Sequence, residues 1–175
     1  MNARQRLING IFVMLALTSN IQAQTHSHAA SYAGQQQRSI KALSAQEQQD
    51  WLEGKGQGLA KAAELNGFPG PMHTLENADA LKLSTAQREA TQSLMHRHKS
   101  AVRTLGQQLV EQEKLPDDLF SKGQVTSEKV SAYTSTIAAL QAQIRAEHLR
   151  THIEQRAILS DSQVAQYNVV RGYAN

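Results

Sequence analysis

Leu83-Ser84-Thr85-Ala86-Gln87 and Leu159-Ser160-Asp161-Ser162-Gln163 are two copies of one pattern, and they enclose the stretch that decides the fold. In each copy a serine stands three residues before a glutamine. A serine at this position accepts a hydrogen bond from the backbone of the third helical residue, whose glutamine side chain bonds back. The two copies therefore predict one helix that begins after Ser84 and another that begins after Ser160.

The residues between the two copies predict two long helices. A stripe of side chains repeats at steps of three and four residues, first as Leu94, His98, Val102, Leu105 and Leu109 and then as Val130, Tyr133, Ile137, Leu140 and Ile144. This spacing places each set on one face of a helix. Pro116 is expected to break or kink the first helix, and residues 121–126, which include Gly123, to form a turn. Long helices joined by a short turn pack antiparallel.

Shorter helices are expected on either side of the long pair. Ser44 and Glu47 form a further capping box, a short helix is expected over residues 72–81, and Gly172 is expected to stop a last helix. Aromatic residues make up only 5% of the chain, which favours helices over a β-sandwich. The predicted fold class is all-α, an antiparallel long-helix hairpin with shorter flanking helices. Each long helix has one apolar stripe, so a second copy is expected to cover it in a homodimer.

The first residues predict export. Arg4 and Arg6 precede an uncharged apolar run, and Ala23 offers a small residue for cleavage, as in a secretory signal peptide. The run is too short to span a bilayer, so stable membrane insertion after cleavage is not expected. We therefore expect a signal peptide at residues 1–23, a flexible polar arm at 24–41 with His26 and His28, and one helical domain at 42–175.

The two Leu-Ser-x-x-Gln segments resemble the Leu-Thr-x-x-Gln repeats of the Spy/CpxP superfamily of periplasmic proteins, which includes CnrX-type heavy-metal sensors. Residues 56–71 and the final Arg171-Gly172-Tyr173 are similar to a subgroup often labelled periplasmic metal sensor or refolding chaperone. The resemblance implies a Spy/CpxP-like hooked dimer in the periplasm. It leaves chaperoning, damping of envelope-stress signalling and metal sensing all open, because one fold serves several functions.

One histidine pair on the second long helix is the best candidate for a metal site. His148 and His152 are four residues apart and share a helix face, so both imidazoles can reach one Zn, Cu, Ni or Co ion. His73 and Glu64 are the further candidate ligands for a metal ion bound by this pair. The alternative is that His148 simply continues the apolar stripe as a core or interface residue, as is also expected of His98.

Several function classes are excluded or disfavoured by the composition. There is no cysteine, which removes thiolate catalysis and thiolate metal sites. Removal of Arg4 and Arg6 lowers the formal charge from +3 to +1, which offers no electrostatic basis for binding nucleic acid. Residue 149 is leucine, so the pair lacks the glutamate of the His-Glu-x-x-His protease motif. No catalytic residues are assigned, and an enzyme is not expected.

Three functions remain at this point. The leading expectation is a periplasmic envelope-stress protein that binds unfolded clients as a chaperone, without ATP and without a required cofactor. The second is a periplasmic heavy-metal sensor or metal-binding protein that uses the helix histidines and a transition metal ion. The third is a structural helical adaptor. The corresponding partners are unfolded periplasmic proteins or an envelope signalling protein.

The export prediction can be checked by mass. We expect the protein recovered from the periplasm to lack residues 1–23, because the basic start and the apolar run are the features that signal peptidase substrates share. Intact-mass spectrometry measures this directly. Recovery of the chain with Met1 through Ala23 still attached would contradict the prediction.

Overall fold

The computed structural model describes residues 31–174. The chain divides into two compact units, Met1–Ala33 and Gly34–Asn175. The expected signal peptide and both arm histidines, His26 and His28, lie outside the described residues. The second unit contains all of the helices in the described range.

The described part of this unit is helical and has no strand, which confirms the all-α fold class. A short 3₁₀ helix, η1 (Gln35–Gln37), precedes six α-helices. These are α1 (Ala45–Glu53), α2 (Lys61–Glu64), α3 (Pro71–Glu76), α4 (Thr85–Ser121), α5 (Ser127–Ile158) and α6 (Asp161–Val170). Among the helices of residues 31–174, none has the length and apolar character that a membrane crossing requires.

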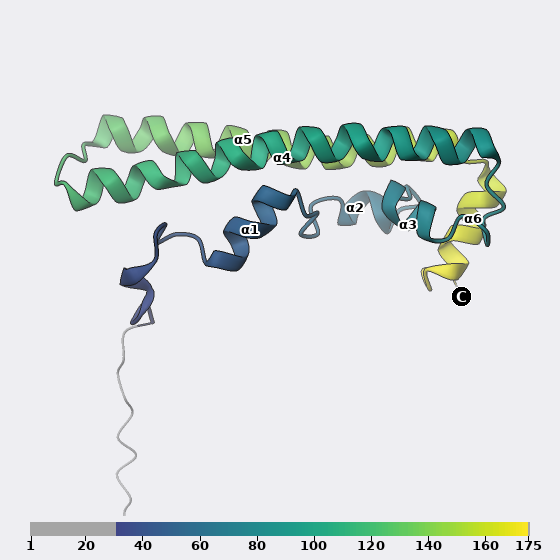
Figure 1. Ribbon diagram of the computed structural model, residues 1–175, viewed down its shortest axis with the longest axis horizontal. Helices are drawn as coiled ribbons and strands as arrows, with labels where there is room; N and C mark the ends of the chain where they lie inside the picture. Colours follow the sequence, from purple (N-terminus) through teal and green to yellow (C-terminus); the bar gives the residue numbers. More distant parts are fainter. Residues whose placement is uncertain (1–30, 175) are drawn as a thin grey trace, which may run out of the picture. The chain divides into compact units, whose positions relative to one another are not determined.

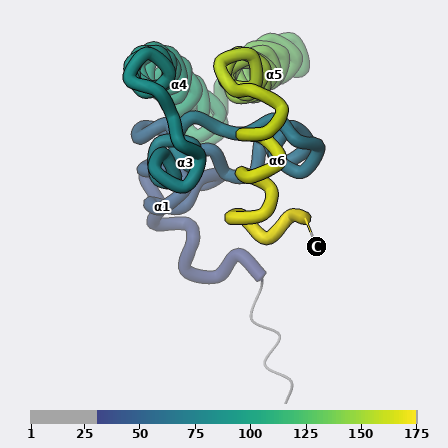
Figure 2. The backbone as a smooth tube through the Cα atoms, turned by 90° about the vertical axis from the view of Figure 1, so that its right-hand side faces the viewer, coloured from purple at the N-terminus to yellow at the C-terminus, as the bar shows by residue number. Residues whose placement is uncertain are grey.

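Two long helices form the frame of the unit. Figure 1 shows α4 and α5 side by side, with the chain reversing between Ser121 and Ser127. The remaining helices lie along one side of this pair, and Figure 2 shows α3 below α4 and α6 below α5. Pro116 lies inside α4, which continues to Ser121, so the expected break does not occur. Proline removes only one backbone hydrogen bond near the end of a long, packed helix.

The predicted helix starts are present. Ser44, Ser84 and Ser160 each cap a helix, and the backbone N–H of each donates to the side-chain oxygen of the residue three positions on. The helix that Ser44 caps ends at Glu53. Gly54 adopts a left-handed conformation with φ of 67°, which stops α1, and α2 starts anew at Lys61.

The two capping glutamines also bind each other. Gln87 Nε2 donates to Gln163 Oε1 at 2.8 Å, and Gln163 Nε2 donates to Gln87 Oε1 at 2.9 Å. The second proton of each amide goes to a backbone carbonyl, that of Ile158 for Gln87 and that of Leu81 for Gln163. We call this reciprocal pair the glutamine clasp. It joins the start of α4 to the start of α6 and satisfies both amides.

A hydrophobic cluster surrounds the clasp. Its buried members come from the turn before α4, the end of α5 and α6, and they are Ala78, Leu81, Leu83, Leu159, Val164 and Tyr167. The leucines of the two repeated segments, Leu83 and Leu159, therefore pack in the same cluster. Each segment supplies a cap, a bridging amide and a core residue.

The other end of the core lies where α1 crosses α4. A Cβ atom placed on Gly106 would come within 2.0 Å of the carbonyl oxygen of Trp51, so the two backbones approach as closely as glycine allows. Ile40 is only 1% exposed and packs with Leu43 and Val110. The last residues of the segment expected as a flexible arm are thus part of the core, because Ile40 fills a space beside α4.

The clasp should make the two glutamines energetically dependent on each other. Replacement of either Gln87 or Gln163 by alanine leaves a half-buried amide without its partner, which should lower the free energy of unfolding by about 1–3 kcal/mol. The double variant should lose less than the sum of the two single losses. Urea denaturation of the four proteins measures the coupling. Gln108→Ala, on an exposed face of α4, is the control, and strictly additive losses would contradict the clasp.

Candidate metal centre

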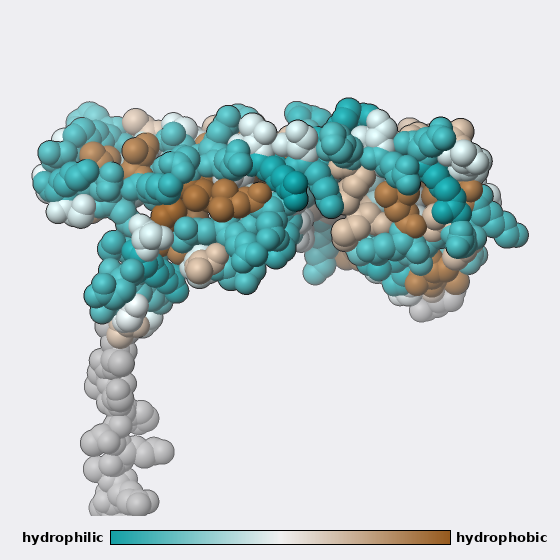
Figure 3. All heavy atoms as spheres, in the orientation of Figure 1, coloured by the Kyte–Doolittle hydropathy of each residue, from teal (hydrophilic) through white to brown (hydrophobic). Residues whose placement is uncertain are grey.

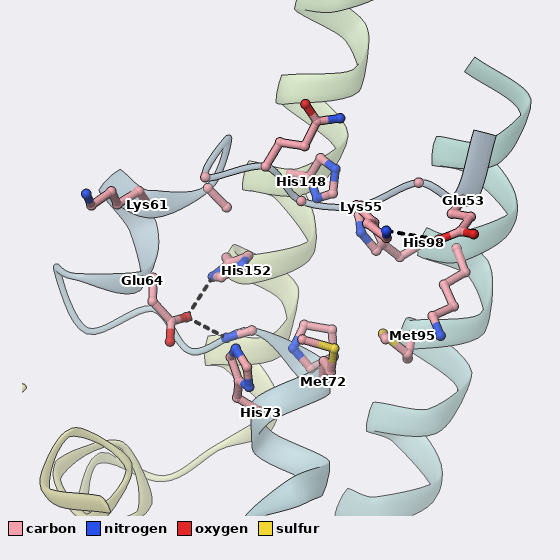
Figure 4. Close-up of a pocket in the computed structure, with 18 of the residues that line it drawn as sticks. Glu53, Lys55, Lys61, Glu64, Met72, His73, Met95, His98, His148 and His152 are labelled. Carbon is pink, nitrogen blue, oxygen red and sulfur yellow. Dashed lines mark hydrogen bonds and ion pairs between the residues drawn. The ribbon is translucent and has the colours of Figure 1, made fainter. Parts of the chain in front are cut away.

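A pocket of about 770 Å³ opens between the long helices and the segment that connects α1 to α3. Its walls include the glycine-rich residues 54–58 and the start of α3. Four histidines line it, namely His73, His98, His148 and His152, together with the thioethers of Met72 and Met95. Figure 4 shows these side chains directed from several helices toward a common space. Neutral imidazole and thioether groups are ligands for transition metals.

His98 and His148 form the floor of the pocket. His98 comes from α4 and His148 from α5, and their ring centres lie 4.6 Å apart with an edge-to-face angle of 69°. Two imidazoles that bind one ion through nitrogens at about 2.0–2.1 Å place their ring centres about 5 Å apart. The observed spacing is close to that value. The contact is edge-to-face, however, so at least one ring would have to turn before both nitrogens could reach the same ion.

Each ring of this pair keeps a nitrogen without a protein partner. His98 Nδ1 lies 2.9 Å from Thr151 Oγ1, which orients the ring and leaves Nε2 without a hydrogen bond to the described residues. His148 Nε2 is buried and has no hydrogen-bond partner among the described residues. A buried polar atom without a partner is costly in a folded protein. Protein atoms enclose this nitrogen, so the ring would have to turn before Nε2 could reach an ion in the pocket.

The pair is neutral over a wide pH range. Burial lowers the pKa of His98 to about 4, and the charges of His148, His152 and Lys99 act in the same direction. Burial also lowers the pKa of His148 to about 4. Only neutral imidazole binds a metal, so both rings are in the binding form at neutral and mildly acidic pH.

His152 stands nearer the mouth of the pocket. Its Nδ1 lies 2.7 Å from the carbonyl oxygen of Phe68, and a carbonyl can only accept, so Nδ1 carries the proton and Nε2 the lone pair. Gly70 gives Nε2 its space, because a Cβ atom there would come within 3.0 Å of it. The Nδ1 atom is also 3.6 Å from Glu64 Oε2.

The carboxylate of Glu64 is occupied by other partners. It accepts from the hydroxyls of Tyr167 at 2.5 Å and Tyr173 at 3.2 Å, and from the Gly70 amide at 3.2 Å. Arg171 Nε lies 3.7 Å away. To serve as the oxygen ligand expected from the sequence, Glu64 would have to give up some of these bonds.

The expected ligand set is therefore only partly assembled. His148 and His152 line the same pocket, but His73 Nδ1 is bonded to Glu76 at 2.7 Å. In the part of the chain that the structure describes, no three histidine, aspartate or glutamate side chains lie close enough together to hold an ion. The assignment of His148, His152, His73 and Glu64 to one site stays a prediction.

His98 is the partner that sequence reasoning assigned only a packing role. It is buried as expected, at 8% exposure, but it also faces His148. The signal was present in the residue numbers, because His98 and His148 are equally far from Gly123 in the turn. Residues equidistant from the turn of two antiparallel helices face each other. The structure also places Met72 and Met95 on the pocket wall.

One of the comparisons with known proteins gave a match. The model of a family described as heavy-metal resistance matches residues 57–166, a range that contains all four pocket histidines and Glu64. The comparisons with curated proteins and with solved structures gave no match. The family is one of the Spy/CpxP-like proteins with Leu-Thr-x-x-Gln repeats, which supports the superfamily resemblance without placing the chain in the CnrX-type subgroup. The chain belongs to the heavy-metal resistance family.

Proposed function

We propose that this protein binds a transition metal ion in the cell envelope, with His98 and His148 as the core of the site. The observation that carries the proposal is the pair of neutral, facing imidazoles on the floor of an open pocket, one with an unpartnered nitrogen. Membership of a heavy-metal resistance family supports it. His152, whose Nε2 carries a lone pair beside the same space, is the third ligand we would test.

The role we favour is metal sensing or sequestration rather than catalysis. The expectation of a chaperone receives no support from the comparisons, and the metal-binding alternative receives loose support from the family match. Export through the segment at residues 1–23 would place the site in the periplasm, where it would meet incoming metal. A signalling protein of the envelope would then be the partner that reads the bound state.

The donor atoms favour borderline to soft ions. Imidazole nitrogen suits Zn, Cu, Ni and Co, and the thioether of Met95 lies on the same face of α4 as His98, three residues away. Hard ions such as Mg and Ca prefer several oxygen ligands. The one lining carboxylate near the histidines, Glu64, is already bonded to tyrosine hydroxyls.

We also propose that the protein forms a homodimer. Large apolar side chains remain exposed near the far end of α4, including Leu115 at 43% and Phe120 at 60%. A groove beside them is lined by Leu119, Ala132 and Tyr133. Figure 3 shows hydrophobic side chains gathered in patches on this part of the surface. Such patches mark interaction sites on soluble proteins.

The metal site predicts a specific loss on substitution. His98→Gln and His148→Gln should each weaken Zn, Ni or Co binding by about tenfold or more, because each removes a ligand. His96→Gln, on an exposed part of the same helix, should leave binding unchanged. Isothermal titration with each metal measures the affinities, and circular dichroism checks that each variant folds. If metal affinity depends on His152 and His73 but not on His98, the assignment of His98 and His148 as the core of the site is wrong.

The pH dependence gives an independent test. Ordinary histidine sites weaken as pH falls through about 6.5 because protons compete for the nitrogen. Burial lowers the pKa of His98 and His148 to about 4, so their metal affinity should persist to about pH 5. The metal-free fold should lose stability between about pH 6.5 and 4, since the unfolded state gains protons there that the folded state does not. Metal titrations and thermal melts at pH 7, 6 and 5 measure both effects.

The dimer prediction concerns Leu115 and Phe120. Light scattering should give twice the monomer mass, and Leu115→Glu with Phe120→Glu should shift the protein toward monomer, because a buried charge without a partner is unfavourable. Leu52→Glu changes another exposed leucine outside this patch and serves as the control. A monomer at micromolar concentration for the unsubstituted protein would contradict the proposal.

A further inference from the structure

The pocket that holds the histidine pair carries more positive than negative charge. Its lining includes five cationic side chains, Lys55, Lys61, Lys99, Arg103 and Arg171, but only two carboxylates, Glu53 and Glu64. A site that attracts bare metal cations would be expected to show the opposite balance. The excess of positive charge therefore needs an explanation.

Both carboxylates of the pocket, those of Glu53 and Glu64, form ion pairs with cations that also line it. Lys55 Nζ lies 3.2 Å from Glu53 Oε2, and Arg171 Nε lies 3.7 Å from Glu64 Oε1. Lys61, Lys99 and Arg103 have no ion-pair partner among residues 31–174, and they also line the pocket. Figure 4 shows the ammonium group of Lys61 directed away from the histidines, which leaves Lys99 and Arg103 as the unpaired cations to consider.

Lys99 and Arg103 stand beside the histidine pair on α4. They are four residues apart and so share one face of the helix, and Lys99 directly follows His98. Arg103 donates from Nε to the carbonyl oxygen of Glu53 in a long contact of 3.4 Å, and its two terminal nitrogens have no hydrogen-bond partner among residues 31–174. Lys99 also acts electrostatically on the His98 ring, where it disfavours a positive charge.

A divalent ion held only by this pair would keep its full charge. Two neutral imidazoles contribute no negative charge. The carboxylate of Glu147 lies 3.8 Å from His98 Nδ1, but the unpaired charges that line the pocket beside the pair are two cations. The pair also leaves coordination positions open, since among the described residues no three histidine or carboxylate side chains are gathered closely enough to hold an ion. The pocket volume of about 770 Å³ far exceeds the needs of one ion and matches sites for small molecules, which occupy about 300–1,000 Å³.

We propose that the pocket binds its metal together with a small oxygen-donor anion, a carboxylate or a phosphate. Oxygens of the anion would complete the coordination of an ion held by His98 and His148, and other oxygens would bind Lys99 and Arg103. Guanidinium groups form paired hydrogen bonds with both kinds of anion. This inference rests on the proposed metal site and adds the chemical class of its second ligand.

The test uses Co(II), whose visible absorption reports its ligands. The purified protein is titrated with Co(II) in a buffer without coordinating anions, then with millimolar malonate, and separately with millimolar inorganic phosphate. After correction for complexes in free solution, at least one anion should raise the affinity for Co(II) about threefold or more and change the spectrum. A response to malonate alone identifies a carboxylate as the co-ligand, and a response to phosphate alone identifies a phosphate.

Substitution of Lys99 and Arg103 should have opposite effects on Co(II) affinity in the absence and in the presence of the anion. In Lys99→Gln with Arg103→Gln, the affinity for Co(II) without an anion should rise, because a repulsion is removed, and the gain from the anion should disappear. Lys122→Gln, at the far end of α4, is the control and should retain the gain. If the double variant does not fold, paramagnetic broadening of the malonate ¹³C signals by the Co(II)-loaded protein reports the same contact without any substitution.

The outcomes separate the two proposals. Co(II) binding that depends on His98 and His148 but shows neither an anion effect nor malonate or phosphate broadening would overturn the co-ligand and leave the metal site intact. An anion effect that survives loss of both cations would place the anion elsewhere and overturn this inference. Absence of Co(II) binding in every buffer would instead overturn the proposed function.

Discussion

The hydrogen bonds between the amides of Gln87 and Gln163 set the geometry on which the rest of the unit depends. Through them, the start of α4 and the start of α6 share one polar junction, which also fixes the carbonyls of Leu81 and Ile158. Because Ile158 is the last residue of α5, the junction fixes the register of α5 along α4. That register brings Thr91 opposite Gln155 and His98 opposite Thr151. The histidine pair is thus a consequence of a bond far from the pocket.

The interface between the long helices changes character along its length. One hydrophobic cluster surrounds the clasp at one end of the interface. Toward the other end, a second cluster consists of Leu109, Leu140 and Ile144. Between them lie buried polar side chains, namely Thr91, His98, His148, Thr151 and Gln155. Polar groups in such a position are costly unless they bond one another or a ligand. Most of them do bond one another, while His148 Nε2 and Gln155 Oε1 are buried without a partner among the described residues.

The local signals in the sequence predicted where helices start, but they did not predict which residues of different helices contact each other. Ser44, Ser84 and Ser160 marked helix starts because capping acts over three residues, within reach of a pattern. The pairing of Gln87 with Gln163 and the close approach at Gly106 depend on residues far apart in the chain, and neither follows from helical spacing. His98 could have been paired with His148 from their positions about the turn. Glu64 could not have been placed, since its tyrosine partners come from the other end of the chain.

The glycine at position 106 has a consequence for how the molecule could respond to its ligand. Since the carbonyl of Trp51 rests against the α4 backbone there, α1 is fixed to the frame by contact between main chains. The glycine-rich segment that follows α1 is anchored on this rigid neighbour. It is attached again at Leu59, which packs against the core of the long helices, and at Phe68, whose carbonyl oxygen accepts a hydrogen bond from His152. A movement that widens or narrows the pocket would therefore be confined to residues 55–58, an exposed stretch between these attachments that we call the flap. The long helices could stay still while occupancy of the pocket is displayed on the surface by that flap alone.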